Sequence, residues 1–338
     1  MSKKKKNASQ TAESQTNDSQ ATENSMPKKH SAVYEFMYEL FHTKKLAAFG
    51  MCILIFFLLV AIFADVISPV KAVDGQIPSS VLEKLEAPSW EHPLGTDSLG
   101  RDLLSYMIYG CRTSVVLGIV CTLLSTLISV IIGVASAVIG GWFDLIVQRF
   151  VDAWQCIPAM LISMILMSIL GNGLIQLILV IAIPAGIGGS RMVRSAAISV
   201  KDSGYSKMST MLGGGNTWKM IKHVTPNILP IIIMNMAGSL GGVIMQEASL
   251  NFLGFGVDVN TPSWGAMLSG QGRSNMYVAP WLAMVPGIAI AIMVFAAAMF
   301  GDGVRDILDP RLKGGVGSYS GNKLKKVVEQ KKRDLNLL

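Results

Sequence analysis

The chain has 338 residues, of which 51% are hydrophobic and only 15% carry a charge, and its mean hydropathy is +0.47. A soluble domain carries about 25% charged residues, so this composition indicates a membrane protein. The net charge of +7 does not indicate nucleic-acid binding, because Lys and Arg gather in the tails and in one internal segment without interleaved aromatic residues. We therefore expect a lipid membrane, and no nucleic acid, among its partners.

Residues 1–30 are polar and almost lack large apolar side chains. Such a segment buries too little apolar surface to offset the entropy of ordering, so we predict a disordered tail. The lysines at residues 3–6 are typical of the start of a signal peptide, but no apolar stretch follows them closely, and we expect no cleavage.

Six apolar stretches are long enough to cross a bilayer, which predicts an all-α polytopic membrane protein with six transmembrane helices. A connector of about 45 residues separates the first span from the second. Pro158 in the third span and Pro184 in the fourth are interpreted as bending points, and residues 171–173 as a tight turn. The predicted spans are residues 47–67, 114–139, 148–170, 174–189, 229–252 and 283–300.

The distribution of positive charge predicts the orientation. All but five of the 29 Lys and Arg residues lie in the tails, in a short loop at Arg149, or in a polar segment at residues 191–230. Because Lys and Arg mark cytoplasmic loops, both termini and the polar segment are predicted to be cytoplasmic. If spans three and four were a single crossing, the orientation of all later segments would be inverted. The uneven distribution of Lys and Arg disfavours that topology. The five remaining residues are Lys71, Lys84, Arg101, Arg112 and Arg273.

The polar segment has two predicted helices. Apolar residues recur at helical spacing in its first half, which predicts an amphipathic helix. They are Val193, Ala196, Ala197, Val200, Met208, Met211 and Leu212. The glycines at residues 213–215 end this helix. Asn216 or Thr217 can cap a second short helix, which Pro226 ends.

Two short helices joined at a glycine turn are suited to pressing an apolar face into a groove of a soluble partner. The alternative is a long cytoplasmic loop without a partner. The pattern of residues leaves both interpretations open.

The sequence contains no recognisable metal or catalytic centre. The cysteines form no CxxC pair and the histidines are scattered. The stretch GSYSGNK at residues 317–323 lacks the Ser or Thr that follows the lysine of a P-loop. We therefore expect no catalytic residues and no cofactor or metal bound by this chain. The residues concerned are Cys52, Cys111, Cys121, Cys156, His30, His42, His92 and His223.

Charged residues at two places are candidates for function. Glu247 lies in the fifth span, where a carboxylate is costly; it either lines a transport pathway or anchors neighbouring helices by hydrogen bonds. A cluster at the end of the sixth span predicts ion pairs that fix this helix end against the polar segment. The cluster comprises Asp302, Arg305, Asp306, Asp309 and Arg311.

The connector carries the stretch HPLGTDSLGRD, residues 92–102, in which Gly95 and Gly100 are turn residues. Asp97, Arg101 and Asp102 can hydrogen-bond locally. With His92, these residues form either a docking surface for a substrate-delivering protein or a structural plug that orders the connector.

Three long stretches in order resemble signatures of the permease subunits of ABC importers for peptides and nickel, the dipeptide and oligopeptide permease family, and of the C-type subunit in particular. They are HPLGTDSLGRDLLSYMIYGCRTS at residues 92–114, EASLNFLGFGVDVNTPSWGAML at 247–268 and GDGVRDILDPRLK at 301–313. The resemblance extends over about residues 47–313.

This resemblance implies a type I importer transmembrane domain that forms half of a translocation pathway in a plasma or inner membrane. It also implies a second permease subunit, usually a different chain, two ATPase subunits that bind ATP and Mg, and an extracytoplasmic solute-binding protein. The cargo and the identity of the second permease stay open.

The resemblance further makes the polar segment a coupling loop, residues 190–228, with contacts to the ATPase. The family's usual Glu-Ala-Ala is replaced here by Lys207, Met208 and Ser209, so an ammonium stands where partners usually meet a carboxylate. The implied coupling residues are Tyr205, Lys207, Met208, Ser209, Leu212 and Gly213.

The predicted organisation has four parts. They are a tail at residues 1–30, a first helix with the external connector at 31–113, a five-helix core at 114–302 and a cytoplasmic tail at 303–338. The alternatives are a secondary transporter or channel that works alone, and an intramembrane enzyme. Against the former stand the lack of a visible inverted repeat and of intramembrane charge pairs; against the latter, no His, Asp or Ser cluster falls on one helix face.

Overall fold

The computed structural model describes residues 32–72, 77–80, 82–258 and 261–308. These residues form helices and loops without a strand, apart from one isolated bridge between Thr96 and Asp102, which confirms the all-α prediction. The predicted tail at residues 1–30, the P-loop-like stretch at 317–323, Asp309 and Arg311 lie outside the described residues. A first unit ends at Thr43 and contains helix α2 (Ala32–Thr43). All that follows concerns the second unit, from Lys44 on.

Five helices of this unit are long and apolar enough to cross a membrane, and a bent pair meets the same criterion when its two helices are taken as one span. The predicted six spans correspond in order to these elements. The five helices are α3 (Lys45–Ile62), α5 (Leu103–Ile139), α8 (Leu174–Lys201), α12 (Leu229–Phe252) and α14 (Trp281–Leu308), and the bent pair is α6 (Gly141–Gln155) with α7 (Ala159–Leu170). A short helix, α4 (Ala64–Ile67), follows α3.

The third span differs from the prediction of one crossing at residues 148–170. Helices α6 and α7 meet at an angle of 87°. Pro158 lies between them with an extended backbone (φ −55°, ψ 126°). A helix tends to end before proline, because proline lacks an N–H and disfavours the helical conformation in the residue before it. Pro158 is thus confirmed as a bending point. Pro184, in contrast, lies inside the continuous helix α8.

Three helices extend beyond the predicted spans. Helix α5 begins at Leu103 instead of residue 114, because the Asp102 side chain accepts a hydrogen bond from the Ser105 N–H and caps it. Helix α8 continues to Lys201, through the first part of the polar segment. Helix α14 continues to Leu308, so residues 303–308 belong to the bundle and not to the predicted tail.

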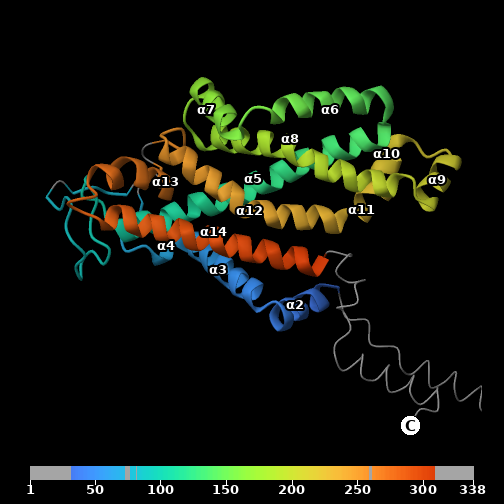
Figure 1. The fold of residues 1–338 in the computed structure, drawn as a ribbon. Coiled ribbons are helices and arrows are strands. Elements are labelled where there is room, and N and C mark those ends of the chain that lie inside the picture. The colour runs from blue at the N-terminus through green and yellow to red at the C-terminus, as the bar shows by residue number, and fades with distance from the viewer. Residues whose placement is uncertain (1–31, 73–76, 81, 259–260, 309–338) are drawn as a thin grey trace, which may run out of the picture. The chain divides into compact units, whose positions relative to one another are not determined.

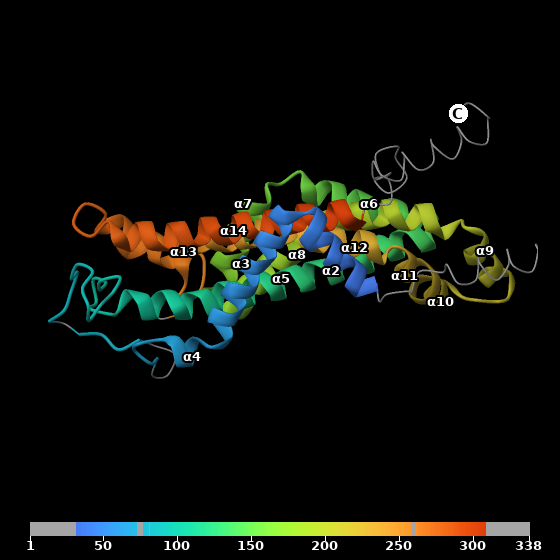
Figure 2. The same ribbon diagram turned by 90° about the horizontal axis from the view of Figure 1, so that it is seen from below.

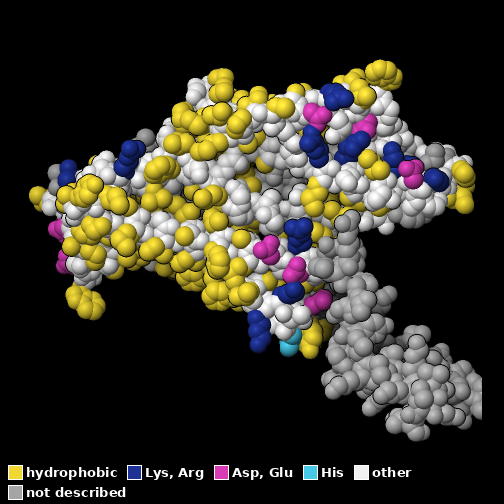
Figure 3. Space-filling model, viewed as in Figure 1, with side chains coloured by type: hydrophobic (Ala, Val, Ile, Leu, Met, Phe, Trp, Pro, Cys, Tyr) yellow, Lys and Arg dark blue, Asp and Glu magenta, His cyan; other side chains and the backbone are white. Residues whose placement is uncertain are grey.

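The long helices pack side by side (Figures 1 and 2). Helix α5 lies along α8, α12 lies along α14, and α3 covers α14 and α5. Close approach of α5 and α8 depends on glycine: a Cβ at Gly133 would lie 2.6 Å from the Ser190 carbonyl oxygen, and one at Gly186 would lie 2.7 Å from Ile128. Hydrophobic side chains cover much of the outward surface of the bundle (Figure 3), as expected of a surface in contact with lipid.

The two motif-bearing regions lie at opposite ends of this bundle (Figures 1 and 2). One end carries α9 (Gly204–Met211), α10 (Asn216–Trp218), the π-helical turn η1 (Lys219–Val224) and α11 (Thr225–Asn227). The other end carries the connector, α13 (Trp264–Met267) and the π-helical turn η2 (Leu268–Gly272). Charged side chains gather toward the end with α9 and α10 (Figure 3).

Candidate functional site

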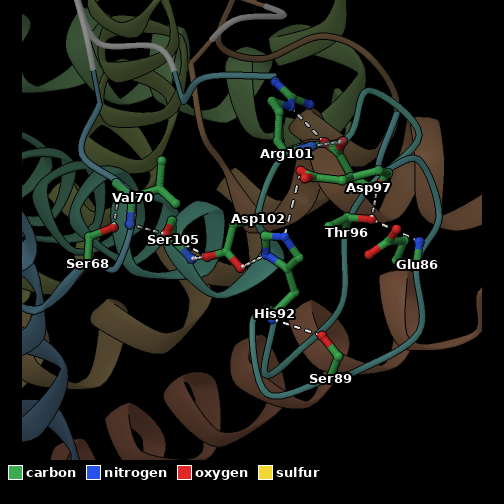
Figure 4. Close-up of polar contacts among 11 residues, drawn as sticks. Ser68, Val70, Glu86, Ser89, His92, Thr96, Asp97, Arg101, Asp102 and Ser105 are labelled. Carbon is green, nitrogen blue, oxygen red and sulfur yellow. Dashed lines mark hydrogen bonds and ion pairs between the residues drawn. The ribbon is translucent and has the colours of Figure 1, made fainter. Parts of the chain in front are cut away.

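The connector is ordered by Asp97, which is buried. One of its carboxylate oxygens accepts hydrogen bonds from the backbone N–H groups of Leu99 (2.8 Å) and Arg101 (2.9 Å). The other accepts from the Arg101 Nε at 2.7 Å (Figure 4), and the guanidinium lies 4.4 Å from the centre of the Tyr106 ring. Gly95 and Gly100 have positive φ values of 82° and 73°, which confirms them as turn residues.

A second contact joins the connector to the start of α5. The His92 Nδ1 lies 3.0 Å from the Asp102 carboxylate, which also accepts from the Ser105 backbone N–H and hydroxyl (Figure 4). The His92 Nε2 lies 3.8 Å from the Glu83 carboxylate. Since these polar groups satisfy one another within the chain, the geometry favours the structural plug over the docking surface.

This contact predicts that the connector loosens as pH rises. The hydrogen bond to Asp102 raises the pKa of His92 above its usual value, and the nearby carboxylates of Glu83 and Glu86 add to this, whereas burial opposes it. A raised folded-state pKa stabilises the connector below about pH 6.5, and this contribution is lost as pH rises through the folded pKa. We expect protease to cut the connector of the membrane-inserted protein faster at about pH 8.5 than at about pH 6.

In the His92→Gln variant the cleavage rate should change little between these two pH values once the protease's own pH dependence is subtracted. An unchanged pH dependence in that variant would show that another group is responsible.

Glu247 of α12 is 1% exposed and lies in a hydrogen-bonded cluster. Its Oε1 accepts from the Asn251 Nδ2 at 2.7 Å and from the Ser263 hydroxyl at 3.4 Å. The Asn251 Oδ1 in turn accepts from the Val257 N–H at 2.9 Å, and a Cβ at Gly256 would collide with that oxygen. The cluster holds the chain after α12 against this helix, which favours the hydrogen-bond anchor over a pathway role.

We therefore expect the Glu247→Gln variant to transport at close to the wild-type rate, because the amide oxygen can accept the same two hydrogen bonds. Glu247→Leu removes the acceptor of a buried amide, which costs about 1–3 kcal/mol, and should lower the amount of monodisperse protein on size-exclusion chromatography. A Glu247→Gln variant that is folded but inactive would instead give the charge a role in the pathway.

The polar segment is divided differently from the prediction. Its first residues continue α8, where Val193, Ala196 and Ala197 are buried. The chain then breaks at residues 202–203 before α9, so the predicted single helix is two. Residues 202–228, which we call the tip, connect α8 to α12.

Two details of the tip also differ. Gly215, and not Asn216 or Thr217, is the N-cap of α10, and no side chain caps it. Pro226 lies inside α11 and does not end the helical stretch. Gly213 has φ 86°, which confirms the glycine break after α9.

The implied coupling residues lie together in the tip. Tyr205, Lys207, Met208 and Ser209 belong to α9, and Leu212 and Gly213 follow it. The tip exposes large apolar side chains that the bundle does not cover. They are Met208, Met211, Leu212, Trp218 and Ile221, each more than half exposed.

Ion pairs that the sequence analysis missed join α6 to α8. Arg194 donates from Nε and Nη2 to the two carboxylate oxygens of Asp144, at 2.6 and 2.5 Å, and Ser136 of α5 donates to the same carboxylate. Arg191 pairs with Asp152 further along. Asp144 and Asp152 lie about two turns apart on α6 and therefore share a face, a signal that was available in the sequence.

Both arginines follow the predicted end of the fourth span at residue 189, so these pairs do not test the expectation that intramembrane charge pairs are lacking. They do not form a cluster of acidic residues that could hold a cation, since each carboxylate faces arginine.

The end of α14 also differs from the prediction. Asp306 pairs with Lys44, next to the start of α3, at 2.6 Å. Asp302 and Arg305 are exposed, and within the described ranges neither forms an ion pair. Among the described residues, the ion pair of this helix end joins it to Lys44 before α3, and none joins it to the polar segment.

The four cysteines are free thiols, with Cys111 and Cys121 buried in α5. Among the described residues, no group of three or more His, Cys, Asp or Glu side chains is arranged to hold a metal ion.

The helical bundle, with the connector at one end and the tip at the other, defines an α-helical polytopic membrane protein with a protruding, partly apolar tip. Residues 101–314 match the family described as binding-protein-dependent transport system inner membrane component, and residues 38–88 match the N-terminal TM domain of oligopeptide transport permease C. The first match spans more than half of the chain. The chain therefore belongs to the inner-membrane permease components of binding-protein-dependent ABC importers, in the dipeptide and oligopeptide branch with C-type subunits.

Curated relatives match over most of their length. The dipeptide transport system permease protein DppC of Alkalihalophilus pseudofirmus is 34% identical over 80% of this chain and 87% of its own. The oligopeptide transport system permease protein OppC of Bacillus subtilis is 34% identical over 81% and 88%. The glutathione transport system permease protein GsiD of Pectobacterium atrosepticum is 35% identical over 68% and 75%.

A chain of the inward-facing MetNI methionine ABC transporter is similar in structure with a TM-score of 0.46 and 16% identity, over 60% of this chain and 96% of that chain.

Proposed function

We propose that this chain is a permease subunit of an ATP-driven importer of peptides, and that its tip contacts an ATPase subunit. The observation that carries this proposal is the exposed apolar surface of the tip, at the end of a helix that belongs to the bundle. Such a surface is costly in water, and docking into a groove of a soluble partner removes that cost.

The proposed complex contains a second, related permease, two ATPase subunits that bind ATP and Mg, and an external solute-binding protein. The proposal that the cargo is a peptide rests on the names of the relatives. The tip and both termini are proposed to be cytoplasmic, in agreement with the gathering of Lys and Arg in these segments. The connector would then face the solute-binding protein's side.

The mechanism follows from the continuity of the tip with the bundle. Helix α8 leads into the tip and α12 leads out of it, so a movement of the tip acts on both helices. The pairs of Arg194 with Asp144 and of Arg191 with Asp152 join α8 to α6. Closure of the ATPase pair would therefore shift α8, α12 and α6 together and reorient the pathway between outward and inward openings.

A pull-down of the tagged protein from its own host in mild detergent tests this function. We expect recovery of a second polytopic permease and of ATPase subunits with P-loop motifs, identified by mass spectrometry. Recovery of this chain alone, with transport activity in liposomes that needs no ATP, would instead support the stand-alone transporter, which the family assignment disfavours.

A further inference from the structure

The surface of the tip has a wide, open hollow that nothing in the described chain fills. Helix α9 forms one side and α10 with η1 forms the other, and the hollow has a volume of about 670 Å³. Its walls include Met208, Leu212, Trp218 and the glycine run at residues 213–215. A volume of this size admits one or two large side chains of another protein.

Two of these glycines border open space. A Cβ at Gly213 or Gly215 would meet no heavy atom within 4 Å. The wall residues are themselves exposed, Leu212 to 82% and Trp218 to 56%. The apolar surface of the hollow is therefore available to a partner side chain.

The tip that carries this hollow is positively charged. The tip contains Lys207, Lys219 and Lys222 but only one acidic residue, Asp202. Lys207 is exposed on α9 next to Met208, and the Lys222 Nζ lies 5.6 Å from the centre of the Trp218 ring. None of the three lysines forms an ion pair with a carboxylate in the part of the chain that the structure describes.

We propose that the hollow is a socket for the ATPase subunit: a large apolar side chain of the ATPase inserts between Met208, Leu212 and Trp218, and flanking Asp or Glu residues face Lys207 and Lys222. This inference rests on the proposed contact between the tip and an ATPase. Charge complementarity favours an acidic partner. A membrane surface is also acidic, but a flat bilayer would cover the outer apolar residues without entering the hollow.

Filling the hollow from within tests the socket. Gly215 has an ordinary extended backbone (φ −70°, ψ 169°), so a side chain can be added there without strain. We expect Gly215→Trp to lower ATPase recovery in the pull-down about tenfold, which corresponds to about 1.4 kcal/mol. The matched control Gly215→Ala adds only a methyl group and should recover as much ATPase as the wild type.

Reversing the charge of the lysines tests whether acidic residues of the ATPase face them. Lys207→Glu and Lys222→Glu should each release the ATPase at lower salt than the wild type, because surface ion pairs weaken with ionic strength. Lys84→Glu, on the exposed connector at the other end of the bundle, is the matched control and should have no effect.

The outcomes separate this inference from the function on which it rests. ATPase that binds the wild type and Gly215→Trp equally well overturns the socket while the ATPase contact stands. ATPase binding that keeps its salt dependence in both Lys207→Glu and Lys222→Glu overturns the proposed contact with acidic residues of the ATPase. Wild-type protein that recovers no ATPase, but whose tip binds anionic lipid vesicles, overturns the contact itself and with it the socket.

Discussion

Replacing Gly213 with proline should abolish uptake of labelled peptides while membrane insertion stays normal. The residue has φ 86°, and proline fixes φ at about −65°, so the chain cannot keep its turn after α9. The turn residues 212–215 are not members of the hydrophobic clusters of the bundle, so bundle folding should not depend on their conformation. The measurement is ATP-dependent uptake per amount of inserted protein.

The matched control is Gly213→Asn, because asparagine tolerates the left-handed region better than other non-glycine residues. This variant should retain a substantial part of the activity. Normal uptake by Gly213→Pro would show that the conformation of the tip does not matter for transport.

Removing Arg194 should give the largest loss of stability among single charge changes in the bundle. Arg194→Leu leaves the Asp144 carboxylate, only 21% exposed, without its bidentate partner. Loss of one partner of a fully buried pair costs about 3–5 kcal/mol, and partial exposure lowers this to about 1–3 kcal/mol. We expect a lower midpoint of thermal unfolding in detergent and reduced transport, because α6 is no longer held to α8.

Arg149→Leu is the control, because Arg149 is 77% exposed and lies 3.7 Å from Asp152, a geometry that contributes little to stability. The double change Asp144→Arg with Arg194→Asp should recover part of the lost stability. An Arg194→Leu variant as stable as the wild type would mean that the pair adds nothing to the packing of α6 on α8.

The spans could be predicted because a bilayer requires a long apolar stretch, and this requirement is local in sequence. The true ends of the helices were less predictable. Polar side chains occur in residues 103–113, at the start of α5, and near Lys201, at the end of α8. The apolar stretch is therefore shorter than the helix at both places. The position of the bend at Pro158 could be predicted from the sequence, but its angle could not.

The same distinction applies to the candidate sites. The contacts of Asp97 with Arg101 and of Asp102 with Ser105 join residues three or four positions apart. Local hydrogen bonding in the connector could therefore be predicted from the sequence. The pair of Lys44 and Asp306 spans most of the chain and depends on how α3 packs on α14. The hollow in the tip depends on the angle between two short helices, which no local pattern predicts.

The central claim is that this chain transports by responding to an ATPase at its tip. Reconstitution of the purified complex into liposomes, with labelled short peptides and the solute-binding protein outside, tests this claim most directly. We predict accumulation of peptide only when the ATPase side has ATP, and none with the Gly213→Pro variant. ATP-independent transport by this chain alone, equal in wild type and Gly213→Pro, would contradict it.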